Sequence, residues 1–139
     1  MGSDTSDVEL TERECWERLR NEAYGRLAVI GPDGPVMYPI NSVVDHGTIV
    51  FRTAAGGKLE AIRADPRVAF EVDGWDVAHD LAWSVLVTGR AHEVVRPLES
   101  AAVTELGVTP WQAGPKPTYI RIDPASITGR RFQRSDRPT

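Results

Sequence analysis

The sequence has 139 residues, 41% hydrophobic and 26% charged, and this length predicts one domain because a second core would need roughly another hundred residues. The formal net charge of −4 argues against a nucleic-acid partner, whose phosphates it would repel. With one cysteine, no apolar run of membrane-spanning length and an acidic start unlike a signal peptide, the chain is expected to be cytoplasmic and to have no membrane partner.

The first regular element is predicted to be a helix that begins after Thr11. Thr11 and Glu14 have the spacing of a capping box, and Leu10 and Cys15 occupy the two positions of a hydrophobic staple. Cys15 and Leu19, four residues apart, share one face of this helix. Cys15 is therefore interpreted as a core residue rather than as a nucleophile.

From Gly25 onward, short apolar runs alternate with turn residues, which is typical of antiparallel β structure. The expected strands are 26–30, 36–44, 48–53, 67–72, 83–95, 119–122 and 127–132. Gly89, near the middle of the longest, marks a bend or bulge of the kind that a barrel corner needs. We predict a mainly β fold, a barrel of about six antiparallel strands over residues 11–132, with flexible segments at 1–10 and 133–139.

Two further helices are expected between the strands. The first covers 58–64, after Gly56 and Gly57, and ends before Pro66. The second covers 97–106, and its spacing predicts a buried side made of Leu98, Ala101, Ala102 and Leu106. These helices are interpreted as plugs for the open ends of the barrel.

The run from Phe51 to Lys58 is the strongest candidate for a binding site. Arg52 and Thr53 end a strand, small residues follow, and Lys58 opens a helix. A guanidinium, a hydroxyl, an ammonium and the amides of a helix N-terminus together suit a phosphate monoester. An ordinary turn with solvated cations fits the same spacing, and the P-loop pattern is absent because Leu59 follows Lys58.

The strand segment Pro39, Ile40 and Asn41 is the second candidate. Proline cannot donate a hydrogen bond to a neighbouring strand, so it indicates either an edge strand or a place where the backbone faces a ligand. In the second case Asn41 would offer a donor and an acceptor to a polar heterocycle. Both interpretations stay open from the residues alone.

Other patterns of catalytic or metal-binding residues are weak. The three histidines, His46, His79 and His92, have no metal-type spacing with one another or with Cys15, so we expect no metal site. Ser84 does not lie in a G-x-S-x-G elbow, so the sequence gives no support to hydrolase chemistry.

Several linked segments between about Thr11 and Phe132 carry a family resemblance. They are Gly25–Ala28, Pro35–Val36, Pro39–Asn41 with Asp45 and Gly47, Ile49–Thr53, Lys58–Leu59, Pro66–Val72, Trp83–Val85 and Gly89–Ala91. In this order they resemble the pyridoxamine 5′-phosphate oxidase-like family, closest to the branch that includes nitroimidazole-resistance proteins. The resemblance implies an FMN-binding split β-barrel that pairs as a homodimer with the flavin between subunits.

The resemblance also implies which residues hold the cofactor. They are Arg52, Thr53 and Lys58 at the phosphate, Pro39, Ile40 and Asn41 along the isoalloxazine ring, Trp83 and Ser84 on a strand near the flavin, and Trp111 over the ring or the substrate space. Nitroimidazole-resistance members commonly have a histidine in place of Arg52, and true pyridoxamine phosphate oxidases carry additional C-terminal sequence. Neither of those two activities is therefore expected.

The leading hypothesis is an FMN-dependent oxidoreductase that moves a hydride or electrons to or from a small molecule. In such an enzyme the flavin carries the chemistry and no protein acid or base is required, so no catalytic residue is predicted. The alternatives are a reductase that uses the deazaflavin F420, a non-catalytic flavin-binding or redox-sensing module, and a cofactor-free interaction barrel.

Overall fold

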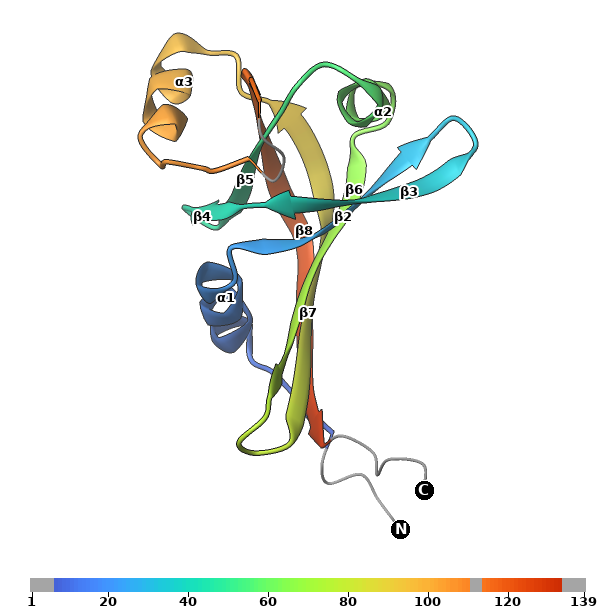
Figure 1. The fold of residues 1–139 in the computed structure, drawn as a ribbon, viewed down its shortest axis with the longest axis vertical. Coiled ribbons are helices and arrows are strands. Elements are labelled where there is room, and N and C mark those ends of the chain that lie inside the picture. The colour runs from blue at the N-terminus through green and yellow to red at the C-terminus, as the bar shows by residue number, and fades with distance from the viewer. Residues whose placement is uncertain (1–6, 111–113, 134–139) are drawn as a thin grey trace.

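The computed structural model describes residues 7–110 and 114–133, which form a mainly β fold (Figure 1). These residues contain eight strands and three helices. In chain order the elements are β1 (Val8–Glu9), α1 (Glu12–Asn21), β2 (Tyr24–Gly31), β3 (Gly34–Asn41), β4 (Val43–Asp45), β5 (Thr48–Thr53), α2 (Gly57–Ala64), β6 (Arg67–Asp76), β7 (Leu81–Glu93), α3 (Pro97–Thr104) and β8 (Thr118–Gln133).

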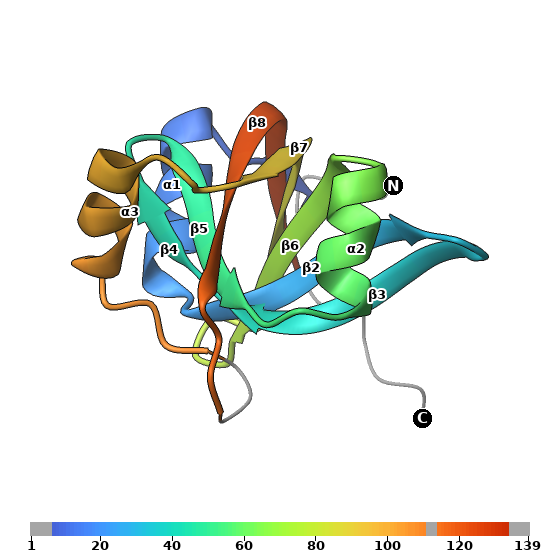
Figure 2. The same cartoon turned by 90° about the horizontal axis from the view of Figure 1, so that it is seen from above.

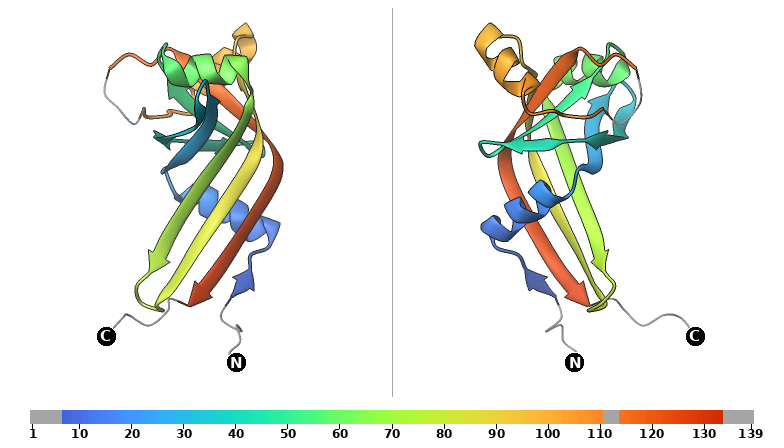
Figure 3. Two further views of the ribbon diagram at one scale, coloured as in Figure 1. Left: turned by 90° about the vertical axis from the view of Figure 1, so that its right-hand side faces the viewer. Right: turned by 60° about the vertical axis from the view of Figure 1, so that its left-hand side comes forward.

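The strands form one curled antiparallel sheet in the order β3-β2-β6-β7-β8-β5-β4, and β1 pairs with β8. The curl brings β3 into contact with β5, so the upper part of the sheet closes into a barrel, seen from above in Figure 2. Below it, β6, β7 and β8 continue side by side as three long strands (Figure 3). The predicted mainly β split barrel is thus confirmed, with α2 and α3 near its upper end (Figure 1).

Helix α1 has the predicted cap. The Thr11 hydroxyl accepts from the Glu14 amide at 3.1 Å, and the Glu14 carboxylate accepts from the Thr11 amide at 2.9 Å. Cys15 and Leu19 are buried and face the sheet, where the helix packs on β4, β7 and β8. The prediction that Cys15 is a core residue is confirmed, and burial raises the pKa of its thiol, which keeps it unreactive.

Gly89 lies at an irregularity of the sheet, as the sequence predicted. The register between β7 and β8 shifts between Thr88 and Gly89, where the strand faces Pro124. A Cβ atom at position 89 would lie 2.2 Å from the backbone oxygen of Asp123. Only glycine allows the two backbones to approach this closely.

The strands differ from the prediction in three main places, and the described residues contain eight strands where about six were expected. The segments 119–122 and 127–132 belong to one continuous strand, β8. The expected strand 36–44 is divided at Ser42, whose amide donates to the Ala23 carbonyl at 2.8 Å before the chain turns to pair with β5. Val8 and Glu9, in the segment expected to be flexible, form β1.

The predicted buried side of the third helix was wrong. Leu98 is 88% exposed, Ala101 and Ala102 are also exposed, and the helix ends at Thr104. The buried side chain is instead Val103, which packs with Val50, Val94 and Val108, and Leu106 contacts this cluster from the following turn. The α3 helix has eight residues and buries only Val103, so a periodicity drawn over ten residues pointed to the wrong side.

A larger cluster fills the barrel and includes Leu27, Ile49, Phe51, Phe70 and Ile120. Side chains from β2, β5, β6 and β8 therefore share one core. Among the described residues, no helix has the length and apolar character needed to cross a lipid bilayer.

Candidate functional site

A small pocket lies where β3, β5, α2 and the segment before β8 meet. Its volume is about 80 Å³, and its lining residues are Tyr38, Pro39, Ile40, Asn41, Arg52, Lys58 and Lys116. The structure therefore brings together the two segments that the sequence singled out separately. Tyr38 and Lys116 were not predicted to be site residues.

The turn between β5 and α2 places two cations at this pocket. Phe51 and Thr53 point into the protein and are buried, so the alternation of a strand leaves Arg52 on the other side, half-buried at the pocket. Gly56 has φ of +148°, a conformation that lets the chain enter α2 directly. No side chain caps this helix, whose first residues are Gly57 and Lys58.

Thr53 is part of this turn but not of the pocket lining. Its side chain is buried, and its hydroxyl donates to the Ala54 carbonyl at 3.2 Å. It shapes the turn that carries Lys58. A direct contact of Thr53 with a ligand, implied by the resemblance, stays a prediction.

Lys58 is a half-buried cation of the pocket. Its Nζ atom lies 5.1 Å from the centroid of the Tyr38 ring and 6.0 Å from that of Phe51. Burial and the neighbouring charge of Lys116 lower its pKa, because both disfavour the ammonium form. A bound anion would stabilise that ammonium.

Arg52 is tied to the segment between α3 and β8. Its Nε donates to the Lys116 carbonyl at 3.2 Å and its Nη1 donates to the Val108 carbonyl at 3.3 Å. The guanidinium carbon also lies 5.2 Å from the centroid of the Tyr119 ring. These contacts use part of the donor set of Arg52 and fix the segment that carries Lys116.

The pocket is strongly positive although the whole chain is acidic. Arg52, Lys58 and Lys116 line it, and none of the described lining residues is a carboxylate. The chain has only two lysines, and both are at this pocket. This donor set fits a phosphate group, while the volume of about 80 Å³ is far below the roughly 300 Å³ or more of a complete small-molecule site. A larger phosphorylated ligand would therefore extend out of the pocket.

Trp83 and Ser84 are not at this pocket in a single chain. Trp83 is buried at the other end of β7, with the Arg18 guanidinium 4.6 Å from its ring centroid, and it lines a separate cavity of about 280 Å³. Ser84 follows Trp83 and pairs with Asp73 on β6. Trp111 lies outside the described residues.

No local sequence signal identified Lys116. It stands between Pro115 and Pro117, and it reaches the pocket only because β8 pairs with β5, from Ile49–Ile122 to Thr53–Thr118. Tyr38 directly precedes the Pro39 segment, and its ring beside Lys58 could have been proposed from that proximity.

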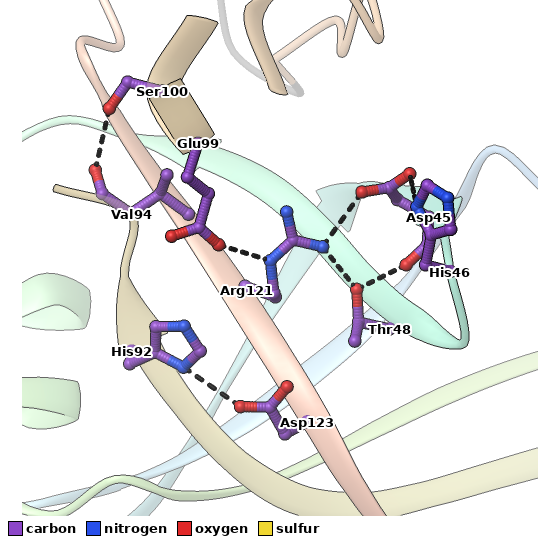
Figure 4. A network of polar contacts seen from close by, with 9 residues as sticks. All are labelled: Asp45, His46, Thr48, His92, Val94, Glu99, Ser100, Arg121 and Asp123. Carbon is purple, nitrogen blue, oxygen red and sulfur yellow. Dashed lines mark hydrogen bonds and ion pairs between the residues drawn. The ribbon is translucent and has the colours of Figure 1, made fainter. Parts of the chain in front are cut away.

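A polar network around Arg121 fixes the elements beside the pocket (Figure 4). The Arg121 guanidinium donates to Glu99 of α3 at 2.9 Å and to Asp45 at 3.0 Å, and it also donates to the Thr48 hydroxyl at 2.6 Å. Burial would raise the pKa of Asp45, but the hydrogen bonds from Arg121 and His46 outweigh it and lower that pKa. The network joins α3 and the β4–β5 turn to β8.

Comparison with known proteins places the chain in a family. The family model described as pyridoxamine 5′-phosphate oxidase matches residues 11–131. The uncharacterized protein Rv0080 of Mycobacterium tuberculosis is 32% identical over 130 residues, which cover 90% of this chain and 85% of that protein.

Two solved structures show the same fold. A Corynebacterium glutamicum protein that bears the name of the same oxidase has a TM-score of 0.81 and 35% identity, over 97% of this chain and all of that one. A Mycobacterium smegmatis protein named as FAD-binding has a TM-score of 0.75 and 36% identity, over 90% of this chain and 97% of that one. The chain belongs to the pyridoxamine 5′-phosphate oxidase family, as its sequence motifs suggested.

Proposed function

We propose that this protein binds FMN, with the flavin phosphate in the pocket formed by Arg52, Lys58 and Lys116, and that it acts as an oxidoreductase on a small molecule. The observation that carries this proposal is the convergence of three cations, with no carboxylate in the described part of the lining, on a pocket of phosphate size. The family membership and the FAD-binding name of the Mycobacterium smegmatis protein support a flavin as the ligand.

Bound FMN would supply the redox chemistry by accepting or donating a hydride. The residues of the chain then have the tasks of binding and orientation. Pro39, half-buried Asn41 and the buried Ile40 line the same pocket as the cations, so a ring system attached to the phosphate would pass along this part of β3. The Asn41 amide offers it a donor and an acceptor.

Replacing Lys58 by glutamine should weaken FMN binding about tenfold or more, because a charge-assisted hydrogen bond contributes roughly 1.5–3 kcal/mol. Glutamine keeps most of the side-chain length and removes the charge. The measurement is a titration of flavin fluorescence with wild-type and K58Q protein at constant ionic strength. Riboflavin, which lacks the phosphate, should bind both proteins equally.

Arg13→Gln is the matched control for loss of one positive charge. Arg13 is on the exposed face of α1, where its side chain is 90% exposed. This variant should bind FMN like the wild type. Equal FMN affinity of K58Q and wild type would remove the phosphate assignment.

FAD is a second candidate, because the Mycobacterium smegmatis protein at 36% identity is named for it. The spectrum of the purified protein and the mass of any released cofactor identify what is bound, and parallel titrations with FMN, FAD and F420 rank the three. Steady turnover with a nicotinamide donor and an acceptor would support an enzyme. Tight flavin binding without turnover over a panel of donors would favour a non-catalytic flavin-binding or redox-sensing module.

We also propose that the flavin site is completed by a second copy of the chain. Trp83 lies far from the pocket along β7. The pocket end of β7 is marked by Glu93, which pairs with Ile120 of β8, and the next residue of β8, Tyr119, pairs with Arg52. Trp83 precedes Glu93 by ten positions. At about 3.3 Å per residue this separates Trp83 from the pocket by roughly 30 Å along the strand. One chain therefore cannot present both Trp83 and Lys58 to one flavin, and we propose that the second chain supplies Trp83.

The exposed outer surface of the sheet is the proposed contact between the two copies. It includes Leu86, 42% exposed on β7, and Met37, 63% exposed on β3. Multi-angle light scattering at micromolar concentration should give the mass of a dimer, and Leu86→Arg should shift it toward the monomer, since a charge would be buried without a partner. A wild-type monomer at this concentration would contradict the proposed dimer.

A further inference from the structure

The contacts of Arg52 indicate that the three cations of the pocket have different roles. Arg52 donates to the carbonyls of Lys116 and Val108, at 3.2 and 3.3 Å. Both carbonyls belong to the segment between α3 and β8. Two donors of one planar guanidinium therefore hold two separated points of this segment, which a single ammonium could not do with the same geometry.

Lys116 is carried by the segment that Arg52 holds. Its side chain lines the same pocket as Lys58 and is half-buried there. The two ammonium groups belong to one small pocket and repel each other, and this repulsion, after burial, lowers the pKa of Lys58. Two like charges held together in a partly buried pocket destabilise it unless an anion lies between them.

We propose that Lys116 contacts the ligand phosphate directly together with Lys58, and that Arg52 is a positioning residue that acts through the backbone of Lys116 and Val108. This inference rests on the proposed binding of a flavin phosphate. It assigns the phosphate contact to two lysines that are 58 positions apart in the sequence and are the only two in the chain.

The first test uses the ratio of FMN to riboflavin affinity, which isolates the contribution of the phosphate. Lys116→Gln should lower FMN affinity about ten- to hundredfold and leave riboflavin affinity unchanged. Lys116→Arg keeps a cation at the same position and should restore most of the loss. An FMN-to-riboflavin ratio in K116Q equal to that of the wild type would overturn the role of Lys116.

The second test is a double-mutant cycle between positions 52 and 116. Arg52→Lys keeps the charge but loses the planar pair of donors, so it should weaken FMN binding about as much as K116Q. If Arg52 acts through Lys116, the double variant should bind FMN no more weakly than the K116Q single variant. Additive losses would show that Arg52 contacts the phosphate independently and would overturn its positioning role.

A third measurement is made on the wild-type protein and uses a substitution only to assign the signals. Because the chain has two lysines, ¹³Cε-lysine labelling gives two signals, which Lys116→Arg assigns by removing one. Titration of the wild type with inorganic phosphate should shift both signals, and both shifts should follow the same saturation curve because one phosphate contacts both lysines. A shift of the Lys58 signal alone would overturn the direct contact by Lys116.

These outcomes separate this inference from the proposed function. If the wild type binds FMN and riboflavin equally and neither lysine signal responds to phosphate, the phosphate site itself is wrong and both proposals fall. The other outcome is that the wild type binds FMN more tightly than riboflavin and that K116Q has the same ratio of the two affinities. In that case the phosphate site stands and only the assignment of Lys116 is wrong.

Discussion

Gly89→Ala should lower the free energy of unfolding by about 3 kcal/mol, a value at the upper end of what overpacking costs. The added Cβ would lie 2.2 Å from the Asp123 oxygen and 3.0 Å from the Pro124 Cα atom. Both are backbone atoms, so no side chain can rotate to make room. The β7–β8 pairing would have to open at the bulge, and urea unfolding monitored by tryptophan fluorescence measures the cost.

Gly57→Ala is the matched control for this substitution. Gly57 is the first residue of α2, where a Cβ would meet only the Tyr38 hydroxyl at 3.7 Å, an ordinary van der Waals contact. Alanine also has the higher helix propensity, so G57A should be as stable as the wild type or slightly more stable. Equal stability of G89A and G57A would show that the bulge does not depend on glycine.

Arg121→Met is expected to destabilise the fold by about 3 kcal/mol. Without the guanidinium, the largely buried carboxylates of Asp45 and Glu99 lose the positive charge that compensates them. The Arg121 side chain is only 12% exposed, and Asp45 and Glu99 are 17% and 31% exposed. Methionine retains the length of the aliphatic part but no donor. Arg63→Met is a control for the same change at an ion pair whose arginine is 57% exposed, and it should cost far less.

The cost of R121M should depend on pH in a defined direction. In the wild type the pKa of Asp45 is lowered from its ordinary value of 3.8, so the stabilisation by this carboxylate is present above about pH 4 and is lost as the pH falls through the lowered pKa. In R121M the burial that raises the pKa of Asp45 is no longer offset by Arg121, so the carboxylate is protonated, and loses its uncompensated charge, at a higher pH than in the wild type. The difference in stability between the two proteins should therefore shrink as the pH falls toward about 3, and a difference that stays constant between neutral and acidic pH would contradict this account.

Local signals in the sequence predicted the elements that depend on neighbouring residues. The Thr11–Glu14 capping box fixed the start of α1, and β5 has the bounds Thr48–Thr53 that were predicted. The Gly89 bulge was also predicted, because a glycine inside a long apolar strand usually marks a bulge or a close approach of two backbones. The capping box acts within a few residues of its own pattern, whereas Gly89 could be recognised from its residue type although the backbone that it approaches, at Asp123, belongs to β8.

Features that depend on distant pairing were not predictable in the same way. The sequence near Pro124 suggested a break between two strands, but pairing with β7 carries β8 through that proline, with a register shift opposite Gly89. Similarly, which side of α3 is buried depends on where Val50 and Val94 lie, and neither is part of the helix's own pattern. Tertiary contacts override local periodicity in both cases.

The candidate site likewise contains residues that local sequence signals identified and one that only distant strand pairing brings into place. The sequence identified Arg52 and Lys58 because they follow one another around a turn, and it identified Pro39 through its unusual place in a strand. It missed Lys116, which β5–β8 pairing brings to the pocket from 58 positions away. The hydrogen bonds of Arg52 to the Lys116 and Val108 carbonyls were equally inaccessible, because they need the whole barrel to be formed.

The pairing of β5 with β8 has a consequence for the kinetics of folding. It joins Thr53 to Thr118, so a loop of more than sixty residues must close before the pocket exists. Such non-local contacts form slowly, on the order of milliseconds to seconds for small β domains. A nascent chain in which only the residues up to α2 have been synthesised therefore contains Lys58 but not Lys116. A ligand that needs both lysines can stabilise only the finished barrel by mass action.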